Sequence, residues 1–308
     1  MILAAIDIGS NAARLLISEV IAQPNGSAIF NKLNLVRVPL RLGFDVFEKK
    51  AISEEKVVMF LETMHSFKHL MAAYKTEAVL ACATSAMRDA NNAADIIEQV
   101  KASTGIFIEV ITGDVEANLI YENHIAENMD KSKSYLYIDV GGGSTELSFF
   151  SNGILVFKQS FNIGTIRILK QMVTDEQWDD LKNTIKTVTK GHSDVVAIGS
   201  GGNINKVFSL SKKKDGKPLP LQLLKDFHQE FNAVPLEDRI SKYGLRADRA
   251  DVIVPALSIY VNVMRWANAA EIYVPKIGLA DGLIQHLWAE INKGALNNAG
   301  KSLIKTKA

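Results

Sequence analysis

Two segments of the chain repeat one pattern, an apolar run that carries an aspartate near its end and then breaks into glycine and small polar residues. The first runs from Ala4 to Asn11 and the second from Leu136 to Glu146. Glycines let backbone N–H groups approach an anion because no Cβ stands in the way. Asp7 and Asp139 stand where they could hold a metal ion against a bound phosphate. The repetition predicts two similar lobes that face one phosphate site.

The two glycine loops are candidates for the groups that clamp a phosphate chain, through backbone N–H groups and hydroxyls. The structural alternative is a pair of tight turns. Three consecutive glycines weaken a strand, so turn geometry alone explains the second loop poorly. We therefore predict phosphate binding by the residues of both loops: Gly9, Ser10, Asn11, Gly141, Gly142, Gly143, Ser144 and Thr145.

The carboxylates beside these loops are candidates for a metal site. Asp7 and Asp139 each lie inside an apolar strand pattern, where a carboxylate costs free energy unless it is paired or bound to a metal. Their alternative role is hydrogen bonding to nearby backbone amides. Because Mg²⁺ prefers oxygen ligands, the matching contexts favour a shared Mg²⁺ site, with Mn²⁺ as a substitute. Its predicted ligands are Asp7, Asp139 and Glu146.

Strand and helix patterns alternate around the loops, and each half of the chain opens with consecutive strands. We predict helices over residues 53–74, 91–104, 115–128, 175–188, 252–267 and 282–291, and strands over 2–8, 78–83, 106–111, 135–140, 145–151, 154–160, 195–198 and 271–274. This order predicts an α/β protein with mixed sheets in two lobes, residues 1–125 and 126–308. The last helix is free to pack back on the first lobe.

Composition limits the class of protein. A chain of 308 residues is long enough for two domains, and its formal charge of +1 argues against a general nucleic-acid binder. The single cysteine, Cys82, excludes an intramolecular disulfide and fits a reducing cytoplasm. The start of the chain lacks the basic lead-in of a signal peptide, and no apolar stretch reaches about 18 residues. We expect a cytoplasmic protein that binds neither nucleic acid nor membrane.

Five segments, in this order, resemble the exopolyphosphatase / guanosine pentaphosphate phosphohydrolase (Ppx/GppA) phosphatase family. They are residues 7–11 with Arg14, 83–88, 113–117, 139–146 and 199–202. The resemblance implies two ribonuclease-H-like lobes of the actin, heat-shock ATPase and sugar kinase superfamily, with a cleft between them. It also implies a magnesium-dependent hydrolase, a homodimer, and a short form without the helical C-terminal domain of longer relatives.

The resemblance assigns catalytic roles to Glu116, Arg88 and Asp139. Glu116 lies on the first turn of a predicted helix, where the helix dipole alone would favour a glutamate. The resemblance makes it the general base that activates water. Arg88 follows a strand and could grip phosphate bidentately, although a solvated surface arginine is the commoner fate. Arg14 and Arg41 are further candidates for phosphate binding.

These features predict an exopolyphosphatase that hydrolyses the terminal phosphate of inorganic polyphosphate by metal-assisted in-line attack of water. Guanosine pentaphosphate is the alternative substrate. Four residues depart from the family pattern: Ala12, Val115, Asn118 and Asp281. They keep open a non-catalytic sensor of polyphosphate or guanosine tetraphosphate, and a sugar kinase or nucleotide-driven ATPase is a third alternative. The sequence does not fix the chain-length preference.

Two groups of basic residues have a structural alternative to a role in substrate binding. Lys212, Lys213, Lys214 and Lys217 lie in a polar loop that is most simply solvated, with guidance of polyphosphate as the other interpretation. Arg246 and Arg249 could line a path for further phosphates or pair with nearby aspartates.

Overall fold

The computed structural model describes residues 1–121, 130 and 132–293. The described residues form two compact units, unit 1 with residues 1–121 and 279–293, and unit 2 with 130 and 132–278. The predicted lobe boundary at residues 125 and 126 lies outside the described residues, as does the end of the predicted helix 115–128. The last helix, which the sequence left free to pack back on the first lobe, belongs to unit 1.

Unit 1 is built on a five-stranded mixed sheet with the strand order β3-β2-β1-β4-β5. Its strands are β1 (Ile2–Ile8), β2 (Ala13–Ala22), β3 (Ala28–Val38), β4 (Ala78–Ala83) and β5 (Ile108–Val110). The central strand β1 pairs antiparallel with β2 and parallel with β4. The antiparallel register sets Asp7 directly opposite Arg14, because the two strands are joined by a turn of four residues.

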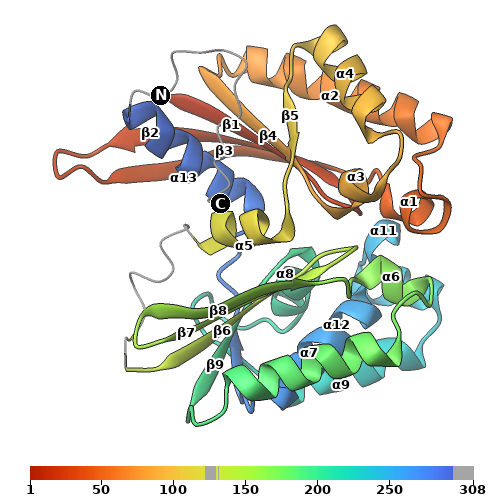
Figure 1. Cartoon of the computed structure of the whole chain (residues 1–308), viewed down its shortest axis with the longest axis vertical. Helices are drawn as coiled ribbons and strands as arrows, with labels where there is room; N and C mark the ends of the chain where they lie inside the picture. The colour runs from red at the N-terminus through yellow and green to blue at the C-terminus, as the bar shows by residue number, and fades with distance from the viewer. Residues whose placement is uncertain (122–129, 131, 294–308) are drawn as a thin grey trace. The chain divides into compact units, whose positions relative to one another are not determined.

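Helices cover both faces of this sheet (Figure 1). They are α1 (Gly43–Lys49), α2 (Glu54–Ala73), α3 (Ser85–Asp89), α4 (Ala93–Thr104), α5 (Gly113–Tyr121) and α13 (Leu279–Asn292). The helices α2 and α4 lie on one face, whereas α13 packs against β1, β2, β4 and α5 on the other. Leu283 and Leu287 of α13 are fully buried, which explains why this helix joins unit 1.

Unit 2 contains a six-stranded mixed sheet with the order β10-β11-β9-β6-β7-β8. Its strands are β6 (Ser134–Val140), β7 (Thr145–Ser151), β8 (Ile154–Phe161), β9 (Val195–Ser200), β10 (Leu219–Pro220) and β11 (Glu271–Tyr273). Strands β6, β9 and β11 run parallel, so their carboxyl ends share one edge of the sheet. Asp139 and Ser200 are register partners at that edge.

Helix α12 of unit 2 has an apolar sequence, and most of its residues are buried. The described helices of unit 2 are α6 (Thr165–Leu169), α7 (Asp175–Val188), α8 (Gly202–Leu210), α9 (Leu221–Ala233), α10 (Leu236–Tyr243), α11 (Ala247–Ala250) and α12 (Ile253–Trp266). Helix α12 contacts α9, α7, α6, α8 and strand β6. It therefore forms the centre of the core under the sheet.

The predicted α/β class with mixed sheets flanked by helices is confirmed. The helix predicted over 175–188 is α7, which begins with a capping box between Thr174 and Gln177. The predicted strand over 78–83 is β4, and the strands predicted around the second glycine loop are β6, β7 and β8. Among the described residues, no helix is long and apolar enough to cross a bilayer.

Candidate phosphate and metal site

The turn between β1 and β2 carries the first predicted loop. The turn is closed by a hydrogen bond of 3.0 Å from the Gly9 N–H to the Ala12 carbonyl. At the end of β1, the buried Asp7 carboxylate accepts a hydrogen bond from Arg14 Nη1 at 2.5 Å. Two predicted site residues thus form one ion pair, and the charge of Asp7 is balanced by Arg14.

A second segment of unit 1 is fixed on this turn. The Arg41 N–H donates to the Asn11 carbonyl at 3.0 Å, and the Gly43 N–H donates to the Ser10 carbonyl at 2.8 Å. Arg41 adopts a left-handed backbone conformation with φ of 54°, which is uncommon for a residue with a side chain. Its guanidinium lies 3.9 Å from the centre of the Phe44 ring. Two residues predicted to bind phosphate, Arg41 and Asn11, therefore lie side by side in unit 1.

A half-buried charge network supports the backbone of Arg41. Lys56 Nζ donates hydrogen bonds of 2.8 Å to the Arg41 carbonyl and to the Asp45 carboxylate, which also accepts from Ser53 Oγ at 2.6 Å. Burial alone would raise the pKa of Asp45, but the hydrogen bonds from Lys56 and Ser53 outweigh it and lower that pKa. Asp45 is therefore an anion that anchors the lysine under the Arg41 loop.

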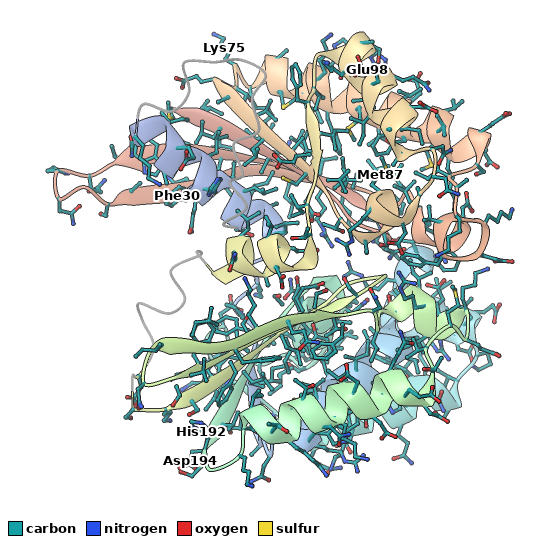
Figure 2. The ribbon with its side chains drawn as sticks, viewed as in Figure 1. Phe30, Lys75, Met87, Glu98, His192 and Asp194 are labelled. Carbon is teal, nitrogen blue, oxygen red and sulfur yellow. The ribbon has the colours of Figure 1, made fainter. Side chains whose placement is uncertain are left out.

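Arg88 lies on α3, directly after β4. Its Nη1 donates to the Ile111 carbonyl at 2.9 Å, at the point where the chain leaves β5. The short helix is anchored by Met87, which is buried (Figure 2), and by Ser85, whose Oγ is 2.8 Å from Ser10 Oγ. This links the second predicted motif to the first loop. It also ties Arg88 to the segment that leads into α5.

Glu116 lies in the first turn of α5 and is half-buried. The helix begins after Thr112, whose carbonyl accepts from the Glu116 N–H at 3.0 Å and whose hydroxyl accepts from the Val115 N–H at 3.3 Å. Burial raises the pKa of the Cys82 thiol, and nearby carboxylates that include Glu116 raise it further. Cys82 is therefore a neutral core residue, as its apolar context indicates.

The second predicted loop joins β6 to β7 and faces α6 with its carbonyl groups. The carbonyls of Gly141, Gly142 and Gly143 accept hydrogen bonds from the Thr165 N–H, the Ile166 N–H and Arg167 Nε, at 3.0, 2.9 and 2.7 Å. In a trans peptide the N–H points away from the carbonyl of the same unit. The N–H groups of the next three residues, Gly142, Gly143 and Ser144, therefore point away from α6. Three such groups in a row form a surface suited to an anion.

The loop can lie this close to α6 because residue 164 is glycine. A Cβ built on Gly164 would be only 2.5 Å from backbone carbon atoms of Gly142 and Gly143. The hydroxyl of Thr145 fixes the same region by donating to the Ile163 carbonyl at 2.6 Å. The position of the N–H groups is thus determined by a segment some twenty residues further along the chain.

Asp139 and Glu146 flank this loop. They face each other across the β6–β7 pair, and a carboxylate oxygen of each lies within 4.8 Å of the other. Glu146 is buried, and its Oε1 accepts hydrogen bonds from Ser144 Oγ at 2.6 Å and Ser160 Oγ at 2.8 Å. Two adjacent carboxylates beside this glycine loop are a donor set that fits Mg²⁺ or another hard divalent cation.

The loop after β9 lies against the Asp139 side chain. Gly201 has φ of 107°, and a Cβ there would lie 3.2 Å from Asp139 Oδ1 and 3.2 Å from the Val140 carbonyl. The buried Tyr260 hydroxyl donates to the Ser200 carbonyl. Burial raises the pKa of Tyr260 well above its ordinary value, and the charge of Asp139 raises it further. Tyr260 therefore stays a neutral hydrogen-bond donor beside the carboxylate.

Other predicted basic residues have structural partners. Arg246 Nε lies 3.2 Å from Asp248 Oδ1, which matches the ion-pair alternative of the sequence analysis. Residues that sequence reasoning missed are Gly164, Arg167, Tyr260 and Lys56. Of these, only Tyr260 gave a signal, as the single tyrosine in the apolar segment predicted as a helix over 252–267.

Comparisons with known proteins agree with this geometry. Residues 20–290 match the Ppx/GppA phosphatase family. A crystal structure of an Aquifex aeolicus Ppx/GppA family member is 26% identical, with a TM-score of 0.74, over 97% of this chain and 99% of that one. A Cytophaga hutchinsonii exopolyphosphatase has the same fold, with 21% identity and a TM-score of 0.79, over 98% of this chain and 100% of that one.

A curated relative in Fusobacterium nucleatum, a bifunctional 3-dehydroquinate synthase/phosphatase, is 35% identical over 176 residues. The match covers 54% of this chain and 26% of that protein, so it spans about a quarter of the relative's length. The solved structures confirm the predicted fold of two α/β units of the actin-like type. With the family model matching most of its length, the chain belongs to the Ppx/GppA phosphatase family.

Proposed function

We propose that the chain is a metal-dependent phosphoanhydride hydrolase that removes the terminal phosphate of inorganic polyphosphate. The observation that carries this proposal is the loop of unit 2, where three backbone N–H groups in succession turn away from α6 beside two carboxylates. The N–H groups suit phosphate oxygens, and the carboxylates suit a cation that neutralises them. Membership in a phosphatase family supports the same chemistry.

The metal would be held by Asp139 and Glu146 in unit 2. A bound Mg²⁺ would neutralise charge on the terminal phosphates and so lower the barrier to attack by water. Ser144 and Ser160 orient Glu146 by hydrogen bonds, and the Gly201 loop backs Asp139. Asp7 would join the ligand set only by exchanging its ion pair with Arg14. Asp139 and Glu146 are therefore the principal ligands of this proposal.

Glu116 would act as the general base. A half-buried carboxylate at the start of α5 can accept a proton from water that attacks the terminal phosphorus in line. Arg88 would stabilise the charge of the transferring group. A guanidinium has five N–H donors, and one hydrogen bond to the Ile111 carbonyl leaves capacity for phosphate oxygens. Arg14, Arg41 and the turn at Gly9–Asn11, all in unit 1, would be further phosphate-binding groups.

A phosphate-release assay on three substrates tests the proposal. The purified chain is given tripolyphosphate, long-chain polyphosphate or guanosine pentaphosphate, each with and without Mg²⁺. We expect magnesium-dependent release of inorganic phosphate from polyphosphate. Release from guanosine pentaphosphate alone would identify the alternative substrate. Binding without release would identify a sensor. In a parallel reaction with ATP and a sugar, consumption of ATP stimulated by the sugar would identify a kinase.

A further inference from the structure

A strongly basic loop lies between α8 and β10 in unit 2. The six residues from Lys212 to Lys217 contain four lysines and one aspartate, all of them exposed, in a chain whose total formal charge is +1. Such a concentration of one charge raises the local concentration of anions. The hydrolase proposed above uses only the terminal phosphate region of its substrate, so this loop is not part of the site already described.

The strand register places the end of the loop, which leads into β10, at the same sheet edge as the candidate metal site. Strand β10 is antiparallel to β11, with Leu219 opposite Ile272, and β11 runs parallel to β9 and β6. Residues that directly precede Leu219 therefore lie beyond the carboxyl end of β11. That is the edge at which β9 ends at Ser200 and β6 carries Asp139.

The loop is held in place and its single acidic residue is paired. The Lys217 N–H donates to the Lys214 carbonyl at 3.1 Å, and the Lys213 N–H donates to Ser211 Oγ at 3.3 Å. Asp215 accepts from Lys276 Nζ at 2.5 Å, and Lys276 follows β11. Because Lys276 balances Asp215, the negative charge of Asp215 does not offset the positive charge of the four exposed lysines.

The spacing suits an extended polyanion. Strand β10 is the third strand from β6 along the sheet, and neighbouring strands lie about 4.8 Å apart, so β10, which the loop precedes, is about 14 Å from the Asp139 strand. The dipole of α8 also favours positive charge after its carboxyl end, which is an alternative reason for Lys212, Lys213 and Lys214. It does not account for Lys217. A phosphate chain whose end is bound beside Asp139 and which follows this edge would reach the lysines.

We propose that the loop of residues 212–217 is a distal subsite that binds phosphate groups remote from the one that is cleaved. The inference rests on the proposed function and deepens it, because it makes the substrate an oligophosphate of several units. The same chemistry could come from a long polyphosphate or from the second phosphate group of a guanosine nucleotide. The lysines contribute affinity for the chain and take no part in the chemical step.

The test is a triple variant, Lys212→Gln, Lys213→Gln and Lys214→Gln, compared with a charge-matched control. The control, Lys182→Gln, Lys186→Gln and Lys190→Gln, removes three charges from α7 and from the turn after it, which leads to His192 and Asp194 (Figure 2). Val195, at the start of β9, pairs with Ser134 at the amino end of β6, so the control lies towards the opposite edge.

Two quantities are measured for each protein. The first is KM for phosphate release, and the second is Kd from titrations without Mg²⁺. Both use long-chain polyphosphate, tripolyphosphate and guanosine pentaphosphate. Exposed ion pairs contribute a few-fold each, so we expect KM and Kd for long chains to rise about tenfold. We also expect their salt dependence to weaken. KM for tripolyphosphate and kcat should stay unchanged. A rise for guanosine pentaphosphate instead would identify a nucleotide as the source of the remote phosphates.

Equal affinities of the triple variant and its control for long chains and for guanosine pentaphosphate would overturn the distal subsite. An equal loss for tripolyphosphate would also overturn it, because a short substrate cannot span about 14 Å of sheet edge. Failure of the proposed function would appear differently, as absence of phosphate release by the unmodified chain from every substrate. The titration tests the subsite in that case too, since it needs no turnover.

Discussion

Replacing Gly164 by alanine should displace the proposed phosphate-binding loop, Gly141–Ser144, without changing any charged group. The added Cβ would lie 2.5 Å from backbone carbons of Gly142 and Gly143, whereas ordinary contacts begin at 3.4 Å. The loop or the start of α6 must therefore move by about 1 Å, and misplacement of that size can reduce turnover about 100-fold. We also expect the free energy of unfolding to fall by about 1–3 kcal/mol, because the site is overpacked.

The assay combines kcat/KM for phosphate release from tripolyphosphate with urea unfolding of the same protein. Gly105→Ala is the control, because Gly105 ends α4 with φ of 76° and a Cβ there would meet nothing within 4 Å. The control should lose about 1–2 kcal/mol of stability from its left-handed backbone but keep its kinetics. A folded Gly164→Ala protein with the kcat/KM of the control would refute the role of the loop.

Three further predictions concern residues that support the site. Tyr260→Phe leaves the Ser200 carbonyl without its buried donor. It should lower the free energy of unfolding in urea by about 1–3 kcal/mol and should also lower kcat. An unchanged kcat would argue against a role of Tyr260 in supporting Asp139. Lys56→Met removes the donor to the Arg41 carbonyl and should raise KM for tripolyphosphate by several-fold, whereas an unchanged KM would mean that Arg41 does not bind phosphate. The pKa of Asp45 is lower in the folded state, so its contribution to stability is present above its ordinary value of 3.8 and is lost as the pH falls through the folded pKa. Asp45→Asn should therefore flatten the acid side of a stability–pH curve measured in urea, and an equally steep curve would contradict this.

The parts of the site that lie close together in sequence could be predicted from it. A glycine triplet between two strand patterns predicts a hairpin, and a hairpin sets Asp139 opposite Glu146. The β1–β2 turn was equally predictable, although the pairing of Asp7 with Arg14 was not used in the prediction. These features depend on period-two alternation and turn residues, which are local properties of the chain.

The parts that depend on distant segments could not be predicted. Gly164 reads as an ordinary loop glycine until the structure shows how closely it approaches Gly142. Tyr260 reaches the Ser200 carbonyl over 60 residues of sequence, and Lys56 of α2 supports the Arg41 loop. Such contacts arise from tertiary packing, which has no local sequence pattern. For the same reason the sequence could not fix which lobe α13 joins.

The measurement that tests the central claim most directly is phosphate release from tripolyphosphate by Glu116→Gln, with Mg²⁺ present. The variant keeps the size of the side chain and removes the proton acceptor, so we expect kcat to fall by about 10²–10⁴-fold while Kd for tripolyphosphate stays within about twofold. The melting temperature of the variant, measured in parallel, should match that of the unmodified chain. Turnover by the variant at the rate of the unmodified chain would contradict the assignment of Glu116 as the base.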